Sequence, residues 1–126
     1  MKKESNSRKI LIIDDELDLR DLYEKLLELQ DYQVFCAASG PDGIQLNEQK
    51  NPDLIILDMH MPGMNGIETL RNIRKTDDSV IVVILTGYAC PDTIREAIDL
   101  NVSEYLSKPF ENKELLNVIG KAFGFK

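Results

Sequence analysis

Short apolar segments and amphipathic segments alternate five times along the chain. The apolar segments have the length of strands and are rich in branched residues; they span Lys9–Ile13, Gln33–Ala37, Asp53–Leu57, Val80–Leu85 and Ser103–Leu106. The third and fourth are apolar at nearly every position, which is typical of strands buried on both faces of a parallel sheet. The pattern therefore predicts five parallel strands.

The segments between these strands carry apolar residues at helical spacing. The clearest stripe predicts the first helix and its buried face; it consists of Leu19, Leu22, Leu26 and Leu29, widened by Tyr23 and Leu27. Proline is tolerated at the start of a helix because its missing N–H has no partner there, which suits Pro41 and Pro91. Further helices are predicted over Pro41–Gln49, Gly66–Lys75, Pro91–Leu100 and Glu111–Phe123.

This alternation predicts an α/β fold with right-handed crossovers. We expect a single flavodoxin-like, doubly wound, five-stranded parallel sheet with helices on both faces. The length of 126 residues suits one domain. We place that domain at residues 8–126, after a flexible polar tail, Met1–Ser7.

Composition and charge exclude several classes of function and partner. With 43% hydrophobic and 29% charged residues, the chain is typical of a globular protein. A formal net charge of -7 argues against direct nucleic acid binding and against anionic lipid. We expect no membrane insertion and a cytoplasmic location, because no apolar run approaches the length of a membrane helix. Cys36 and Cys90 lack C-x-x-C spacing, so reduced structural thiols are expected.

Polar residues follow four of the predicted strands. Asp14 and Asp15 follow the first strand, Asp58 the third, Thr86 the fourth and Lys108 the fifth. In such sheets ligands bind beyond the carboxyl ends of the strands. Three neighbouring carboxylates repel one another unless they share a proton or bind a cation. Oxygen ligands suit Mg²⁺, with Mn²⁺ as the alternative, and Mg²⁺ readily adds phosphate oxygens, so the pattern predicts a phosphoryl ligand.

Asp58 is the best-placed nucleophile among these acids, because it stands alone at a strand end and is followed by a loop. A carboxylate can attack a phosphoryl group and form an acyl phosphate. The ammonium of Lys108 and the hydroxyl of Thr86 are the group types that hold phosphoryl oxygens as charge builds up on them. Helix capping is a second role open to Asp14 and Asp15.

The residues at these four strand ends resemble the receiver domains of two-component response regulators. The matching motifs are Asp14-Asp15, Asp58 with Met61-Pro62-Gly63-Met64-Asn65-Gly66, Thr86-Gly87, and Lys108-Pro109-Phe110. The resemblance extends from about Arg8 to Phe123. It implies the strand order 2-1-3-4-5, for which a chemotaxis member of this family is a well-known example.

The resemblance also implies a role for each acid. Asp58 is expected to accept a phosphoryl group from a sensor histidine kinase or a phosphotransfer protein. Asp15 would bind Mg²⁺ directly, Asp14 would position the metal through water, and the backbone carbonyl of His60 would supply a further ligand. The domain would assist its own phosphorylation and dephosphorylation without being a turnover enzyme.

Further residues take switching and architectural roles by the same resemblance. Thr86 and Tyr105 form the expected switch pair, and ordinary half-buried packing in a strand is the less favoured alternative for Tyr105. Lys108 and Pro109 are expected to be joined by a cis peptide that aims the lysine at the site. Gly66 is expected to relieve backbone crowding after Asp58.

The resemblance further implies that two bulky residues, His60 and Tyr88, flank the path of the hydrolytic water and modulate the lifetime of the phosphoryl group. Phosphorylation is expected to switch the face formed by the fourth helix and the fifth strand and helix. Members of the family use this face for homodimers or for downstream proteins.

Two alternatives lie outside this function. A haloacid dehalogenase type phosphatase also uses an aspartate nucleophile, but it requires a second aspartate two residues later, where this chain has His60. A receiver-like binding module that is never phosphorylated is the other alternative, and the intact set of acids argues against it.

Overall fold

The computed structural model describes residues 7–87 and 90–124. Five strands and five helices alternate in it. They are β1 (Lys9–Ile13), α1 (Leu17–Glu28), β2 (Gln33–Ala37), α2 (Gly40–Lys50), β3 (Leu54–Asp58), α3 (Gly66–Thr76), β4 (Ile81–Thr86), α4 (Pro91–Asp99), β5 (Glu104–Ser107) and α5 (Asn112–Ala122). Residues 1–6 of the expected N-terminal tail lie outside the described residues.

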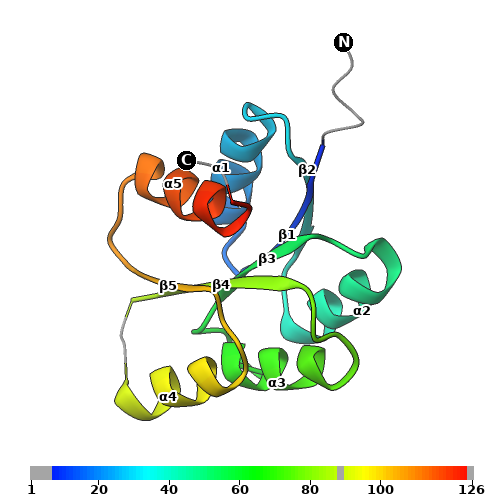
Figure 1. The fold of residues 1–126 in the computed structure, drawn as a ribbon, viewed down its shortest axis with the longest axis vertical. Helices are drawn as coiled ribbons and strands as arrows, with labels where there is room; N and C mark the ends of the chain where they lie inside the picture. The colour runs from blue at the N-terminus through cyan, green and yellow to red at the C-terminus, as the bar shows by residue number, and fades with distance from the viewer. Residues whose placement is uncertain (1–6, 88–89, 125–126) are drawn as a thin grey trace.

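The strands form one parallel sheet in the order β2-β1-β3-β4-β5. Figure 1 shows α1 and α5 on one face of the sheet and α2, α3 and α4 on the other. The predicted flavodoxin-like fold and its strand order are therefore confirmed. None of the helices in the described part of the chain has the length and apolarity needed to cross a membrane.

Alternate residues of the central strands feed two separate cores. Ile10 and Ile12 of β1 pack in the cluster beneath α1 and α5, whereas Leu11 and Ile13 pack in the cluster beneath α2, α3 and α4. Every residue of β3 is buried. Both faces of the sheet are thus covered, as the continuous apolar runs predict.

Three strands extend one residue further toward their carboxyl ends than the apolar pattern predicts. β3, β4 and β5 end at Asp58, Thr86 and Ser107 rather than at the apolar residue before each. The pairing of Asp58 with Leu85 and of Thr86 with Ser107 explains the shift. Backbone hydrogen bonding continues a strand regardless of side-chain polarity, so Asp58 and Thr86 are held by the sheet itself.

Four of the six residues of the predicted stripe on α1 pack in the core, and the prediction is wrong for Leu22 and Leu29. Leu22 and Leu29 are 45% and 78% exposed, whereas Tyr23 and Leu27 are buried. Tyr23 stacks on Phe110, with 6.3 Å between the ring centroids. Leu29 is exposed because it is the C-cap residue, at the end of the helix. The other leucines surround much of the helix, so packing against the sheet determines that the face around Tyr23 and Leu27 is buried.

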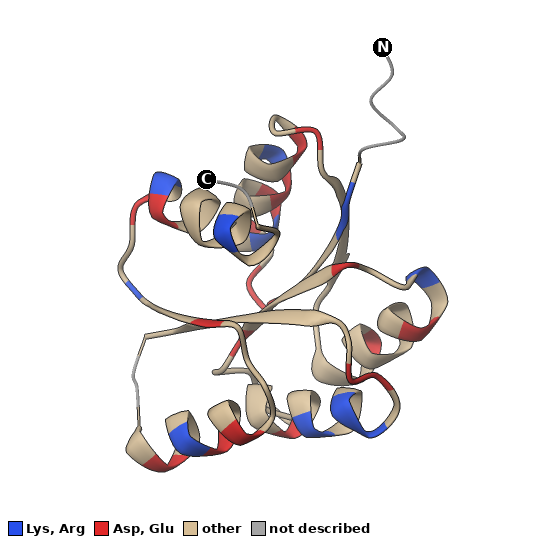
Figure 2. Ribbon diagram, viewed as in Figure 1, with Lys and Arg blue, Asp and Glu red and all other residues tan. Residues whose placement is uncertain are grey.

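Two arginines of α3 hold α4 against it. Arg71 donates two hydrogen bonds to one carboxylate oxygen of Glu96, at 2.8 Å and 2.6 Å. The guanidinium of Arg74 donates to four backbone carbonyls, those of Asp77, Val80, Leu100 and Asn101. Figure 2 shows basic and acidic residues along the neighbouring helices α3 and α4. The C-terminal end of α4 is therefore tied to the turn between α3 and β4.

Candidate functional site

The three predicted acids meet at the carboxyl edge of the sheet. Asp14 follows β1 and Asp58 ends the neighbouring strand β3, while Asp15 begins the loop into α1. One carboxylate oxygen from each residue lies within 4.8 Å of the others. Asp14 and Asp58 are only 1% and 3% exposed, whereas Asp15 is open to solvent. The structure thus brings the predicted acidic cluster together.

The loop between β1 and α1 fixes the orientation of Asp14. The backbone N–H of Glu16 donates to Asp14 Oδ1 at 2.9 Å, and the guanidinium of Arg20 donates to the Asp14 carbonyl oxygen at 2.8 Å. Glu16 is the N-cap residue of α1, so neither Asp14 nor Asp15 occupies the N-cap position. Asp14 instead accepts a hydrogen bond from the backbone N–H of that N-cap residue. Arg20 was not among the predicted site residues, because its contact depends on the path of the loop.

Positive charge compensates the acidic cluster only in part. Burial raises the pKa of Asp14 to about 6, and the charges of Asp58 and Asp15 add to this rise. The Glu16 N–H and the Lys108 ammonium oppose it. Asp14 Oδ2 is buried and makes no hydrogen bond. An unpartnered oxygen within a set of mutually repelling carboxylates fits a hard divalent cation such as Mg²⁺.

Two donors converge on one oxygen of the predicted acceptor. Lys108 Nζ lies 3.4 Å from Asp58 Oδ1, and the backbone N–H of His60 donates to the same oxygen at 3.4 Å. The Lys108–Pro109 peptide is cis. The backbone N–H of Lys108 donates to the carbonyl of Thr86 at 2.7 Å, which joins the end of β4 to the segment after β5. The sheet thereby presents the ammonium to the acceptor.

The predicted switch residues are neighbours on β4 and β5. Thr86 is 1% exposed, and Tyr105 is half-buried beside Ile84 with its hydroxyl oxygen buried. Burial raises the pKa of Tyr105, the charge of Cys90 adds to the rise, and the Thr86 side chain opposes it. The hydroxyl of Thr86 also lies 3.4 Å from Nε2 of His60. Thr86 is thus a neighbour of both His60 and Tyr105, and the switch role of the pair stays a prediction.

Gly66 sits where the loop after β3 folds back on the acceptor. A Cβ atom at this position would lie 2.7 Å from both the carbonyl oxygen of Asp58 and the Cα of Met59. Both are backbone atoms that cannot turn aside. The next helix begins with a capping box in which Asn65 and Glu68 exchange hydrogen bonds. Gly66 thus permits the close approach that the sequence pattern predicts.

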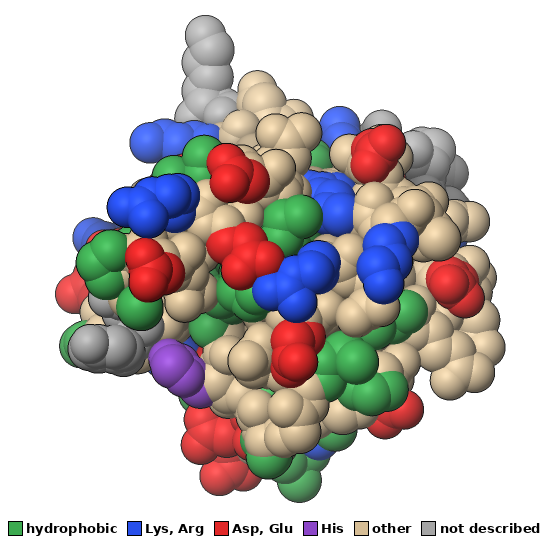
Figure 3. All heavy atoms as spheres, turned by 90° about the horizontal axis from the view of Figure 1, so that it is seen from below, with side chains coloured by type: hydrophobic (Ala, Val, Ile, Leu, Met, Phe, Trp, Pro, Cys, Tyr) green, Lys and Arg blue, Asp and Glu red, His purple; other side chains and the backbone are tan. Residues whose placement is uncertain are grey.

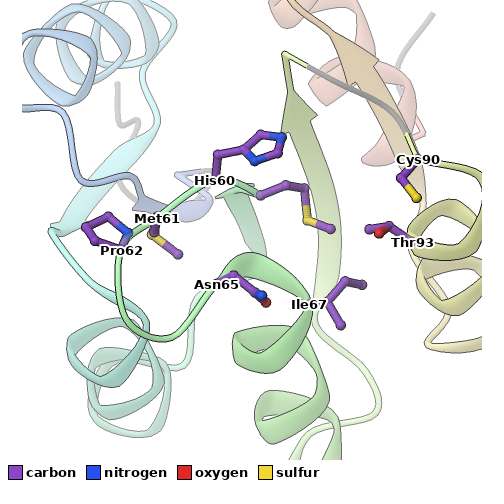
Figure 4. Close-up of a pocket in the computed structure, with 8 residues that line it drawn as sticks. His60, Met61, Pro62, Asn65, Ile67, Cys90 and Thr93 are labelled. Carbon is purple, nitrogen blue, oxygen red and sulfur yellow. The ribbon is translucent and has the colours of Figure 1, made fainter.

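His60 is exposed and lies at the rim of a cavity of about 460 Å³ between the β3–α3 loop and the start of α4. The cavity is lined by Met59, His60, Met61, Pro62, Asn65, Ile67, Cys90 and Thr93 (Figure 4). His60 appears in purple at the molecular surface in Figure 3. Tyr88, the other residue expected to modulate the phosphoryl lifetime, lies outside the described residues.

Comparisons with known proteins agree with this arrangement. Residues 10–120 match the model of the response regulator receiver domain family. The sporulation initiation phosphotransferase F of Bacillus subtilis (strain 168) is 35% identical over 120 residues, which cover 95% of this chain and 97% of that protein.

Solved structures show the same likeness in three dimensions. A CheY-like receiver domain protein from Methanospirillum hungatei JF-1 superposes with a TM-score of 0.90 at 27% identity, covering 94% of each chain. The chemotaxis protein CheY4 of Vibrio cholerae gives a TM-score of 0.87 at 26% identity, covering 92% of this chain and 98% of that one. A receiver domain protein from Clostridium thermocellum gives 0.86 at 34% identity, with 93% and 94% covered.

Proposed function

Because this chain belongs to the receiver domain family of two-component response regulators, we propose that it accepts a phosphoryl group on Asp58. The proposal rests above all on one juxtaposition. The Asp58 carboxylate lies within 4.8 Å of two further carboxylates and 3.4 Å from the Lys108 ammonium. Such a set can hold a cation, a phosphoryl group and a nucleophile together. The donor would be a sensor histidine kinase or a phosphotransfer protein, the class of partner that the family implies.

In the transfer step, an oxygen of the Asp58 carboxylate forms a bond to phosphorus while the bond between phosphorus and the donor nitrogen breaks. The electron pair of the broken bond returns to the donor imidazole. Lys108 and the hydroxyl of Thr86 stabilise the negative charge of the transferred group, which requires positioning rather than a general base. The His60 N–H and Lys108 both hold Asp58 Oδ1, so the carboxylate is oriented before the donor arrives.

Asp14, Asp15, Asp58 and the carbonyl of His60 are the residues that would hold Mg²⁺ or Mn²⁺. The unpartnered, buried Oδ2 of Asp14 supports this assignment. The bound ion would neutralise charge on the carboxylates and on the phosphoryl oxygens. Asp15 is the exposed member of the cluster and would exchange readily between ion and water.

The chemical change would bias a two-state element rather than deform the whole sheet. Thr86 is placed to move toward a phosphoryl group, and Tyr105 on the neighbouring strand is placed to follow. The output would be the face formed by α4, β5 and α5, which would bind a second copy or a downstream protein. We also propose that the chain acts in the cytoplasm, where it would encounter the kinase domain that phosphorylates it.

Incubation with acetyl phosphate and Mg²⁺, followed by intact-mass spectrometry, tests the proposal. We expect the wild-type chain to gain the mass of one phosphoryl group, and we expect no gain for Asp58→Asn or in the presence of EDTA. Asp99→Asn, an exposed acid at the end of α4, is the matched control and should behave as wild type. A wild-type chain that is never modified would instead be a binding module.

A further inference from the structure

The imidazole of His60 reaches the hydroxyl of the switch threonine. Thr86 Oγ1 and His60 Nε2 are 3.4 Å apart, and the two residues come from different elements, β4 and the β3–α3 loop. Figure 4 shows the His60 ring projecting from that loop toward the end of β4. The contact therefore links the loop after the acceptor to the residue that would report phosphorylation.

The Thr86 hydroxyl can donate its hydrogen bond to only one acceptor at a time. A threonine hydroxyl has one proton to donate, and the neutral imidazole tautomer that carries its proton on Nδ1 accepts it at Nε2. Phosphoryl oxygens only accept hydrogen bonds. The proton of Thr86 therefore cannot be donated to His60 and to a phosphoryl group on Asp58 at the same time.

We propose that His60 is a positioning residue that holds the Thr86 hydroxyl proton in the unphosphorylated protein and competes for it with the phosphoryl group. This inference rests on the proposed phosphorylation of Asp58. It assigns to the His60 side chain a task separate from the ligand role of its backbone carbonyl. It also differs from shielding of the hydrolytic water, because it acts on an equilibrium between two hydrogen bonds and not on the rate of hydrolysis.

The geometry of the contact between His60 and Thr86 would allow phosphorylation to break it. Thr86 is almost wholly buried, while the His60 ring is exposed and can turn into solvent once the hydroxyl leaves it. A separation of 3.4 Å is long for a hydrogen bond between a hydroxyl and a nitrogen. A bond to a charged phosphoryl oxygen is shorter and stronger. Replacing the Thr86–His60 hydrogen bond by one from Thr86 to the phosphoryl group is therefore favourable. His60 lowers the fraction of molecules in which Thr86 binds the phosphoryl group, but does not prevent that contact.

Equilibrium binding of beryllium fluoride with Mg²⁺ tests the inference, because this phosphoryl mimic is not hydrolysed. Binding is followed through the amide NMR signals of the residues around Asp58. A net hydrogen bond of ordinary strength corresponds to a factor of about two to ten, so His60→Ala should tighten the apparent affinity by that factor. His60→Phe keeps a ring but no nitrogen and should tighten it equally.

Thr86→Val provides the decisive background, because it keeps the side-chain shape and removes the hydroxyl. In this background His60→Ala should leave the affinity for beryllium fluoride unchanged. An equal tightening in both backgrounds would show that His60 acts on the mimic or on water directly, and would overturn the inference. Unchanged or weaker binding in the single His60→Ala variant would overturn it as well. If the wild-type chain binds no beryllium fluoride and takes no phosphoryl group from acetyl phosphate, the proposed function itself fails.

Discussion

Replacing Asp14 with asparagine should stabilise the metal-free protein. Asparagine keeps the oxygen that accepts the Glu16 N–H, and its amide nitrogen takes the place of the buried Oδ2 that has no partner. The substitution also removes one of three negative charges that lie within 4.8 Å of one another. A residue placed for metal binding thus weakens the fold whenever no cation is bound.

The magnitude follows from the pKa of Asp14. A rise from 3.8 to about 6 corresponds to about 3 kcal/mol at 1.36 kcal/mol per pKa unit. Solvent reaches the cluster through the exposed Asp15, and screening reduces this to about 1–2 kcal/mol. Between pH 3.8 and about 6 the folded protein binds more protons at Asp14 than the unfolded chain does. The contribution of Asp14 to the free energy of unfolding therefore falls as the pH rises through this window, and above it the full penalty applies.

Urea unfolding in EDTA, followed by circular dichroism because the chain has no tryptophan, measures this difference. At a pH of about 7.5 we expect Asp14→Asn to raise the free energy of unfolding by about 1–2 kcal/mol, or the melting temperature by about 3–8 °C. Near pH 4 both proteins are nearly neutral at position 14, and the difference should shrink below about 0.5 kcal/mol. Magnesium at a hundredfold excess over its dissociation constant should stabilise the wild type by about 2.7 kcal/mol and the variant by less.

Two results would refute this reasoning. A variant that is no more stable than the wild type at neutral pH would show that the buried carboxylate is already compensated. A stability gain of the same size at both pH values would show that packing, rather than charge, separates the two proteins. Asp99→Asn again serves as the control, because it also removes one charge but lies outside the cluster.

Three further predictions concern the scaffold and the site. Gly66→Ala should lower the free energy of unfolding by about 1–3 kcal/mol in chemical denaturation, because its Cβ meets backbone atoms at 2.7 Å. Asp77→Ala should lower it by about 1–3 kcal/mol near neutral pH, since its carboxylate accepts hydrogen bonds from Ser79, Val80 and Asn47. Those bonds outweigh burial and lower the pKa of Asp77, so the loss should fade in acid, as the pH falls through that lowered pKa. Lys108→Ala should slow phosphorylation by acetyl phosphate about 10² to 10³-fold, measured as the rate of mass gain, if its ammonium stabilises the transferred group.

The fold was predictable because its strongest signals are repeated and local. Five apolar runs separated by helical spacings leave few alternatives to a parallel α/β sheet. The acidic cluster was predictable for a related reason, since parallel strands bring their carboxyl ends to one edge. Asp14 and Asp58 needed no knowledge of the loops to be placed together. The placement of both acids therefore follows from the strand order, which the resemblance to receiver domains supplied.

Features that depend on loop paths or on choices among equivalent faces were not predictable. The stripe on α1 contains more apolar residues than one face can bury, and only contact with the sheet selects Tyr23 over Leu22. The contact between His60 and Thr86 requires the direction of a side chain in an irregular loop. Arg20 likewise reaches a backbone carbonyl, which carries no signature in the sequence.

The hydrogen bonds of Arg74 anchor the C-terminal end of α4, whereas its N-terminal end has no such anchor among the described contacts. Arg74 joins the carbonyls of Leu100 and Asn101 to those of the turn after α3. A guanidinium keeps its charge throughout the physiological pH range, and its partners are peptide groups that do not titrate. Changes in acidity do not remove this anchor. If phosphorylation shifts α4 as proposed above, the movement would be smaller at this anchored end than in its first turn, beside the cavity that His60 and Thr93 line.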